Sequence, residues 1–269
     1  MDTIGFVGAG NMAEALINGL TKAEIYAPAD ILISDIKAER LKLLAEKYGV
    51  SIAQNNAELA AKVDILVLSV KPQNMNEALE SIKDAFKQDT LVISIAAGIK
   101  TANVAALLGD AAIVRVMSNT PALIGEGASA LFANEKAKPA LDKARRIFSA
   151  VGRAVVVEDE GLIDAVTAVS GSGPAYYFLL MEEMINAAEQ LGLAGDVAKE
   201  LVLQTAKGAS LLAVDADKRG ETPAELRRKV TSPGGTTEAA LKVFSDSRFG
   251  PTVAAAIERA RDRSRELSG

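Results

Sequence analysis

The sequence predicts an α/β protein in which a Rossmann-like, doubly wound and mostly parallel sheet precedes an all-helical C-terminal domain. Through the first 160 residues, apolar runs of strand length alternate with stretches of helical periodicity. Such alternation is typical of parallel strands joined by crossover helices on both faces of a sheet. After Glu160 the strand signals stop and helical periodicity continues. We therefore expect two domains, residues 1–160 and 161–269.

The expected strands are short, mostly apolar runs. In chain order they are Thr3–Val7, Ile31–Ser34, Ser51–Ala53, Ile65–Ser69, Leu91–Ile95, Ile113–Met117, Ala128–Phe132 and Ala154–Val157. Helices between them include Met12–Lys22, Ala38–Lys47 and Thr101–Leu108, and glycines end the last two. Later helices are expected over 174–191, after a capping box at 222–225, and in an arginine-rich segment ending near Leu267.

Composition excludes several classes of function. The formal net charge of −5 over 269 residues provides no field that would gather nucleic acid or anionic lipid. The chain has no cysteine and no histidine, so we expect no metal site and no imidazole acid or base. No apolar run approaches the roughly 18 residues of a membrane helix, and no signal peptide is recognisable. We expect a cytoplasmic protein with no membrane partner.

A glycine-bearing turn follows the first expected strand. Gly8-x-Gly10-x-x-Ala13 stands between a strand and a helix, where two glycines allow a pyrophosphate to approach a helix N-terminus closely. The alternative is a strand-to-helix turn that binds nothing. The context favours a dinucleotide site.

Two opposing signals follow the second strand. Asp35 could accept a hydrogen bond from the ribose 2′-hydroxyl of NAD, whereas Ser34, Lys37 and Arg40 could hold the 2′-phosphate of NADP. Alternatively, Asp35 is a helix N-cap and the two basic residues form a solvated helix face.

Three further segments follow strands at the sheet edge where ligands bind. Val70-Lys71-Pro72 could line a cofactor, or could be a proline turn with an exposed lysine. Ser94–Gly98 could let the backbone approach a nicotinamide, or could reflect tight strand–helix packing. Asn119–Pro121 is most simply a turn, although its position after the sixth strand also permits a role in a site.

Two small-residue turns late in the chain, within Asp164–Tyr177 and Thr231–Thr237, are predicted to open helices. Their glycines permit close approach, their hydroxyls can donate, and in each a proline presets the first helical residue. Backbone N–H groups then collect at one point and favour an anion. Together with the glycine turn, these segments indicate a nucleotide site and a site for a small acid in one protein.

The expected helix over 174–191 is apolar nearly all round in its first turns. A helix of this kind must be buried, and a helical region of about a hundred residues offers little interior. A partner subunit would cover it most simply, although the Rossmann-like domain could do so instead.

On these motifs the chain resembles the pyrroline-5-carboxylate reductases, and the resemblance spans nearly its whole length. It implies a Rossmann-like domain, a helical domain that interlocks with that of a second subunit, and a homodimer that in many members assembles into a decamer. It also implies reduction of the cyclic imine 1-pyrroline-5-carboxylate to L-proline, the last step of proline biosynthesis. The implied cofactor is NADPH or NADH, and Asp35 after Ser34 leaves that choice open.

Carried over to this sequence, the resemblance implies three groups of residues. Around the pyrophosphate and adenosine it places Val7, Gly8, Ala9, Gly10, Asn11, Met12, Ser34 and Asn56. Toward the nicotinamide it places Ser69, Val70, Lys71, Pro72, Ile95, Ala96 and Ala97. Around the substrate it places Glu160, Gly235 and Thr236, with Thr167, Ser232 and Thr237 as the catalytic residues.

The chemistry of the implied reaction agrees with the composition. An imine is basic enough to bring its own proton, so a reductase needs no strong protein acid, whereas a hydroxy-acid dehydrogenase usually uses His or Lys. Two alternatives remain. A hydroxy-acid or ketopantoate-type dehydrogenase could use Lys71 as its acid, and a redox-responsive dinucleotide-binding dimer would bind cofactor without turnover.

Overall fold

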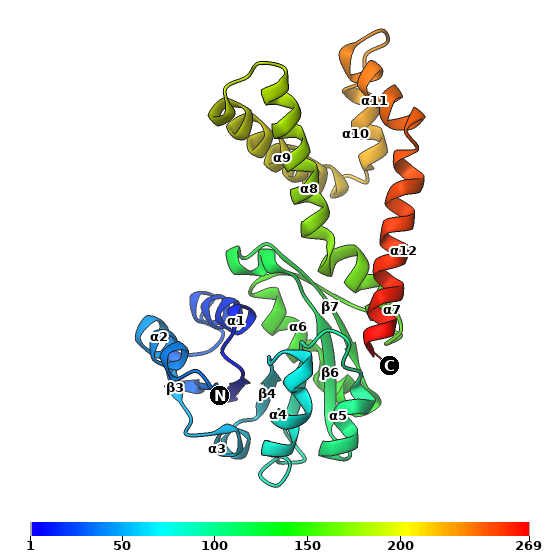
Figure 1. The fold of residues 1–269 in the computed structure, drawn as a ribbon. Helices are drawn as coiled ribbons and strands as arrows, with labels where there is room; N and C mark the ends of the chain where they lie inside the picture. The colour runs from blue at the N-terminus through cyan, green and yellow to red at the C-terminus, as the bar shows by residue number, and fades with distance from the viewer. Residues whose placement is uncertain (1, 269) are drawn as a thin grey trace. The chain divides into compact units, whose positions relative to one another are not determined.

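The computed structural model describes residues 2–268 and contains one eight-stranded sheet (Figure 1). The strands are β1 (Ile4–Val7), β2 (Ile31–Ser34), β3 (Ser51–Ile52), β4 (Ile65–Leu68), β5 (Leu91–Ser94), β6 (Ala112–Met117), β7 (Gly127–Ala133) and β8 (Gly152–Val156). Their order is β3-β2-β1-β4-β5-β6-β7-β8. Each predicted strand is present, within a few residues of its predicted ends.

The sheet is parallel except for one pair. β6 and β7 run antiparallel, with Val114 opposite Ala133 and Met117 opposite Ala130. They are joined by a short connection that contains a 3-10 turn (Thr120–Ile124), and a connection of this kind suits antiparallel neighbours because parallel ones need a long crossover. The prediction of a mostly parallel, doubly wound sheet is confirmed.

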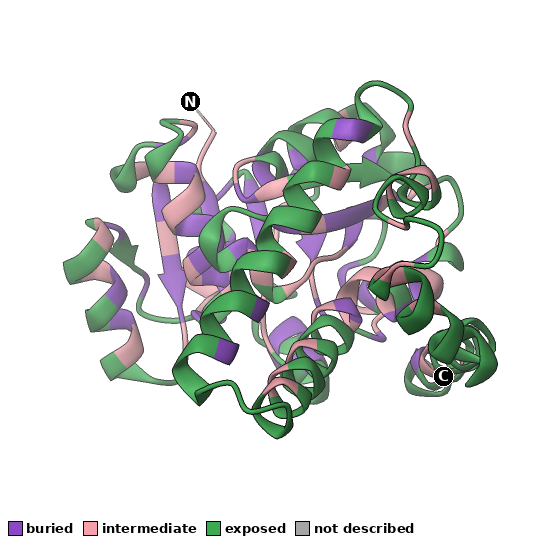
Figure 2. Ribbon diagram, turned by 90° about the horizontal axis from the view of Figure 1, so that it is seen from above, coloured by how far each residue is buried: buried purple, intermediate pink, exposed green. Residues whose placement is uncertain are grey.

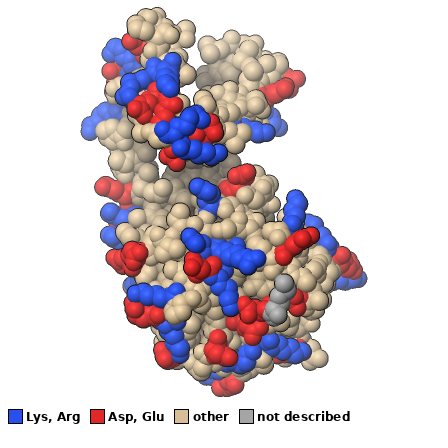
Figure 3. All heavy atoms as spheres, turned by 180° about the vertical axis from the view of Figure 1, so that it is seen from behind, with Lys and Arg blue, Asp and Glu red and all other residues tan. Residues whose placement is uncertain are grey.

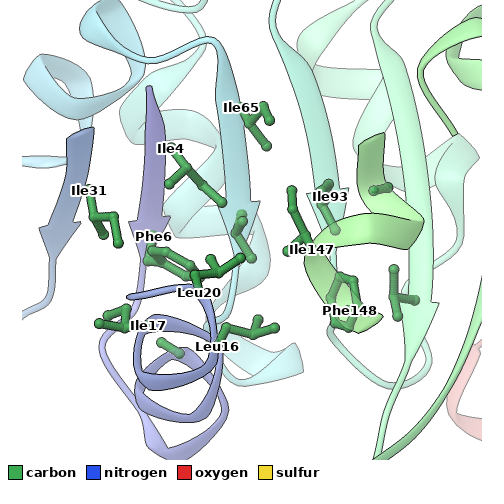
Figure 4. Close-up of a cluster of buried hydrophobic side chains, with 14 of the residues drawn as sticks. Ile4, Phe6, Leu16, Ile17, Leu20, Ile31, Ile65, Ile93, Ile147 and Phe148 are labelled. Carbon is green, nitrogen blue, oxygen red and sulfur yellow. The ribbon is translucent and has the colours of Figure 1, made fainter. Parts of the chain in front are cut away.

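Helices cover both faces of the sheet. They are α1 (Asn11–Lys22), α2 (Ala38–Tyr48), α3 (Asn56–Lys62), α4 (Met75–Ile82), α5 (Thr101–Leu108) and α6 (Leu141–Ser149). One apolar cluster packs α1, α2 and α6 on one face, and Figure 4 shows Phe6, Leu20 and Phe148 within it. A second cluster packs α3, α4 and α5 on the other face. Strand side chains alternate between the two clusters, as expected of a sheet buried on both sides.

The chain after β8 is helical. It forms α7 (Leu162–Val166), a π-helix (Thr167–Gly171), α8 (Gly173–Gln190), α9 (Gly195–Asp217), α10 (Pro223–Lys229), α11 (Thr236–Asp246) and α12 (Phe249–Ser268). The predicted capping box is present, because the Thr222 side chain accepts from the Glu225 N–H and the Glu225 carboxylate accepts from the Thr222 N–H. No strand follows Val156 in the described part of the chain.

The described chain divides into two compact units whose limits differ from the predicted boundary at residue 160. The sheet unit comprises the residues up to Pro174 and the end of α12 from Arg259, and the helical unit comprises Ala175–Glu258. α7 and the π-helix belong to the sheet unit because Ile163 and Ala168 are buried and pack with it.

The helical unit has almost no interior of its own. Among its described residues only Ala198, Val202 and Ala216 are buried, and its helices are largely exposed (Figure 2). The first turns of α8 expose Tyr177, Phe178 and Leu179 by more than half of their surface. A chain normally buries apolar helices of this kind against a partner.

None of the described helices is long and apolar enough to cross a membrane. On the face drawn in Figure 3, basic and acidic side chains are interspersed, without an extended field of one sign.

Candidate functional site

The glycine turn between β1 and α1 has the geometry of a dinucleotide-binding turn. Gly8 has a φ of +96°, and a Cβ atom there would lie 2.8 Å from the carbonyl oxygen of Ser69. Gly10 is the N-cap of α1 with no side-chain cap, and a Cβ atom on it would meet nothing within 4 Å. The backbone at Ser69, directly after β4, therefore requires glycine at position 8. At position 10 the structure leaves room beside a helix N-terminus, where an anion is favoured.

Residues from the end of β2 and the start of α2 hold this turn in place. The Asp35 carboxylate accepts from the Ala9 N–H at 2.7 Å and from the Lys37 N–H at 2.9 Å. Arg40 Nε donates to the Ala9 carbonyl at 2.7 Å. The interpretation of Asp35 as a helix N-cap is wrong, because the N-cap of α2 is Lys37. The side chain of Asp35 instead orients the turn.

Arg40 also forms an ion pair with Glu14 on α1. Glu14 on α1 accepts hydrogen bonds from Arg40, Lys47 and Tyr48. Burial raises the pKa of Glu14, but the hydrogen bonds from these three partners outweigh it and lower the pKa to about 2. Arg40 is therefore not simply part of a solvated helix face. Beside it, a hollow of about 560 Å³ opens over the start of α2, lined by Lys37, Ala38, Glu39, Arg40 and Leu43.

The residues predicted at the adenosine side contact one another. The buried Ser34 hydroxyl donates to Asn56 Oδ1 at 2.7 Å, and Asn56 Nδ2 donates to Ser81 Oγ at 2.9 Å. The structure thus joins the end of β2 to the start of α3.

Three of the predicted cofactor segments meet at one edge of the sheet. Val7 pairs with Leu68, and Leu68 pairs with Ser94, so the chain leaves β1, β4 and β5 at the same level. The Ser69 hydroxyl donates to the Gly8 carbonyl at 2.6 Å, and the Ile95 N–H donates to the Leu68 carbonyl at 3.1 Å. This level is the carboxyl edge, where open parallel sheets bind their ligands.

The remaining residues of these segments differ in exposure. Val70 is half-buried and packs on the apolar cluster under α4, whereas Lys71 and Pro72 are exposed at a 3-10 turn (Pro72–Asn74). Ala96 is buried and Ala97 is exposed. Asn119 does more than form a turn, because its amide donates to the Ser170 carbonyl and its oxygen accepts from the Ala128 N–H.

Thr167 begins the π-helix at the end of α7. Its hydroxyl donates to the Ile163 carbonyl at 2.8 Å, and the Ser172 N–H donates back to the Thr167 carbonyl. Single π-turns are frequently found at functional sites. The expectation of a small-residue turn within Asp164–Tyr177 is wrong, because α7, the π-helix and the start of α8 occupy nearly all of that segment. The residue pattern did not predict the π-helix.

The second late turn precedes α11 and belongs to the helical unit. Gly235 is the N-cap of α11, and its N–H donates to the Ser232 carbonyl at 3.0 Å. The Gly234 N–H donates to the Glu238 carboxylate at 2.7 Å. Pro233 lies in the turn before the helix, so the expectation that it presets the first helical residue is wrong. Thr236 and Thr237 occupy the first helical positions, whose N–H groups lack partners within the helix.

Glu160 lies among protein donors in the sheet unit. Its carboxylate accepts from the Thr101 N–H at 2.7 Å and from the Thr101 hydroxyl at 2.8 Å. Arg115, which is 2% exposed, lies 3.2 Å away. Arg115 and Thr101 are absent from the sequence-based site, although a lone arginine inside the apolar strand Ile113–Met117 is a signal that could have marked it.

The described residues contain no cluster of acidic side chains that could hold a metal ion.

Comparisons with known proteins agree with this layout. Residues 160–267 match a family model described as pyrroline-5-carboxylate reductase dimerisation. Residues 3–98 match one described as NADP oxidoreductase, coenzyme F420-dependent. The pyrroline-5-carboxylate reductase of Pseudomonas aeruginosa is 48% identical over 267 residues, which cover 98% of this chain and 96% of that protein. The chain belongs to the pyrroline-5-carboxylate reductase family.

Solved structures of pyrroline-5-carboxylate reductases share the fold over nearly their full length. The enzyme from Coxiella burnetii is 40% identical with a TM-score of 0.93, covering 100% of this chain and 99% of that one. The Plasmodium falciparum protein, solved with NADP bound, is 30% identical with a TM-score of 0.86, covering 100% and 98%. Both units of this chain are therefore part of the fold that these reductases share.

Proposed function

We propose that this protein reduces 1-pyrroline-5-carboxylate to L-proline with a nicotinamide cofactor. The observation that carries the proposal is full-length similarity, at 48% identity, to a protein named for this activity. The geometry supports it, because a dinucleotide-binding turn, a π-helix that begins at Thr167 and a turn with Ser232 before α11 occur in one chain. Neither alternative function accounts for both of the late segments.

The residues present fit a dinucleotide. The room at Gly10 and the close approach of β4 at Gly8 suit a pyrophosphate beside the N-terminus of α1. Val7 to Met12 would hold the pyrophosphate, Ser34 and Asn56 the adenosine side, and Ser69–Pro72 and Ile95–Ala97 the nicotinamide side. The bound cofactor supplies the hydride.

The protein's own contribution is chiefly binding and orientation. The N–H groups at the start of α11, around Gly235 to Thr237, would bind the substrate carboxylate. The hydroxyl groups of Thr167, Ser232 and Thr237 would orient the ring nitrogen. The imine is basic enough to arrive protonated, and no histidine or cysteine is present to supply a proton near neutral pH. We therefore assign any neutral ionisation in kcat/KM to the substrate.

NADPH is the proposed preferred cofactor, by a modest margin. Lys37 borders the hollow over α2 and can meet a 2′-phosphate, whereas the Asp35 carboxylate beside it repels one. Arg40 contributes less than its charge implies, because Ala9 and Glu14 already engage it. We expect kcat/KM with NADPH to exceed that with NADH by about tenfold, equal to about 1.4 kcal/mol. A larger value with NADH would reverse the assignment.

The active form is proposed to be a cytoplasmic homodimer, with a decamer as a further assembly. Support comes from the match of residues 160–267 to the dimerisation family and from the exposed apolar helices of the helical unit. Light scattering would distinguish a dimer from a decamer.

The decisive experiment is oxidation of NADPH, and separately of NADH, by the purified protein with 1-pyrroline-5-carboxylate. Formation of L-proline supports the proposal. Turnover of a 2-oxo acid without turnover of the pyrroline would indicate a hydroxy-acid or ketopantoate-type dehydrogenase, and tight cofactor binding without turnover would indicate a binding protein.

The pH profile of kcat/KM tests the assignment of the proton to the substrate. Any inflection near neutral pH should remain in Lys71→Met. Loss of that inflection in the variant would identify Lys71 as the proton source.

A further inference from the structure

The loop between β5 and α5, residues 95–100, is anchored by side chains from distant parts of the sheet unit. At its far end, Thr101 begins α5 and is buried. Its N–H donates to Glu160 Oε1 at 2.7 Å and its hydroxyl donates to Oε2 at 2.8 Å. Both carboxylate oxygens of Glu160 thus accept hydrogen bonds from the first residue of a helix, where a negative charge is favoured.

A buried arginine fixes Glu160 in turn. Arg115 lies on β6 directly opposite Ser94, the last residue of β5. Its Nη1 atom lies 3.2 Å from Glu160 Oε1. Glu160 is the only acidic partner of Arg115 in the described residues. A buried guanidinium is costly without a counter-charge, so Arg115 and Glu160 depend on each other.

The other side of the loop meets the end of α12. Gly98 has a φ of +75°, and a Cβ atom there would lie 3.1 Å from the carbonyl oxygen of Leu267. That end of α12 is anchored by a buried hydrogen bond of 2.7 Å from Ser264 to Asp164 on α7. The loop therefore passes close to the Leu267 backbone at Gly98 and is held by hydrogen bonds at both ends, from the Ile95 N–H to Leu68 and from Thr101 to Glu160.

We propose that Glu160 is a positioning residue of the cofactor site and not a ligand of the substrate. It holds the start of α5, and so keeps residues 95–98 in the conformation that receives the nicotinamide end of the cofactor. This inference rests on the proposed cofactor site. Glu160 is 21% exposed and already accepts three hydrogen bonds, so little of its carboxylate is left for a second ligand.

The test compares Glu160→Gln with Glu158→Gln, which makes the same change at an exposed position of the same segment. NADPH affinity is measured by calorimetry without substrate, and hydrogen exchange is followed in peptides covering 95–108. In Glu160→Gln we expect the dissociation constant of NADPH to rise about tenfold and exchange to increase, because binding must then order the loop. The KM for the pyrroline should change less than about twofold. Glu158→Gln should match the parent.

Other results would overturn the inference. A raised KM for the pyrroline with unchanged NADPH affinity would make Glu160 a substrate ligand, and a lower melting temperature with both constants unchanged would make it merely structural. Arg115→Lys should retain more NADPH affinity than Arg115→Met, because it keeps the charge beside Glu160. Since NADPH binding is measured without the pyrroline, failure of the proposed reaction would be seen separately.

Discussion

The sheet unit and the helical unit solve the problem of apolar burial in opposite ways. Two apolar clusters, one on each face of the sheet, bury most of the large apolar side chains of the sheet unit. The helical unit buries only two alanines and a valine, and exposes aromatic and aliphatic side chains along α8 and α9. We infer that the sheet unit can be stable through its own contacts, whereas the helical unit requires another surface to cover its apolar side chains.

The largest effect should follow a charge placed on the exposed face of α8. Leu179 is 58% exposed, and Leu179→Arg should weaken the dimer by about 3 kcal/mol or more, about a hundredfold, because it puts an unpaired charge in an apolar contact. The matched control is Val155→Arg at the sheet edge, where Val155 is 57% exposed. Light scattering and activity should change only in the first variant. Equal behaviour of the two would remove the contrast between the units.

The sheet unit should instead be sensitive at the glycine turn. Gly8→Ala adds strain at a φ of +96° and a contact of 2.8 Å with the Ser69 carbonyl, which should lower stability by about 3 kcal/mol. Gly10→Ala adds a methyl group where nothing lies within 4 Å, and should reduce NADPH affinity without changing the melting temperature. Thermal unfolding and cofactor titration separate the two. A lower melting temperature of Gly10→Ala would show that the fold itself, and not only the cofactor, requires glycine at position 10.

The sequence predicted the sheet unit well, because each of its strands and helices is specified by residues that are close together in the chain. Most strands are short apolar runs between turn residues, and the two glycines of Gly8-x-Gly10 mark a turn that allows close approach. The antiparallel direction of β7 and the π-helix at Thr167 are not encoded so simply, since both depend on how the neighbouring segments pack.

The candidate site was harder to predict where a side chain has several partners within reach. The pattern around Asp35 and Arg40 allowed a cofactor, a helix cap or solvent. In the structure both side chains also hold Ala9, a contact between residues about 30 positions apart that no periodicity specifies. The same holds for Glu160, whose partners Thr101 and Arg115 come from other strands and helices.

A smaller effect is expected in the helical unit at the turn before α11. Thr237→Ala removes one hydroxyl at the proposed acid-binding turn, and Ser232→Ala removes another. Each should reduce kcat/KM for the pyrroline by roughly thirtyfold. This factor corresponds to about 2 kcal/mol of transition-state stabilisation, as for a lost hydrogen bond to a charged group. NADPH affinity and dimer mass should not change. If kinetics with the pyrroline are unaltered in both variants, the turn is only a helix cap.

The smallest effect concerns charge inside the sheet unit. Glu14 joins α1 to three side chains of α2, and its pKa is about 2 instead of 4.5. A carboxyl group with a lowered pKa in the folded state stabilises the fold above about pH 4.5, and this contribution is lost as the pH falls toward 2.

Glu14→Gln should therefore lower the stability of the sheet unit at pH 7 by about 1 to 2 kcal/mol, a value that allows for solvent around a side chain that is 18% exposed. The difference in melting temperature between parent and variant should shrink by more than half from pH 7 to pH 3, since the unfolded carboxyl is then protonated. Glu46→Gln is the control, because Glu46 lies on α2 with an exposed pair to Lys42. A difference in melting temperature that stays constant with pH would mean that Glu14 stabilises the fold through packing. A contribution from its charge would have to disappear as the carboxyl is protonated.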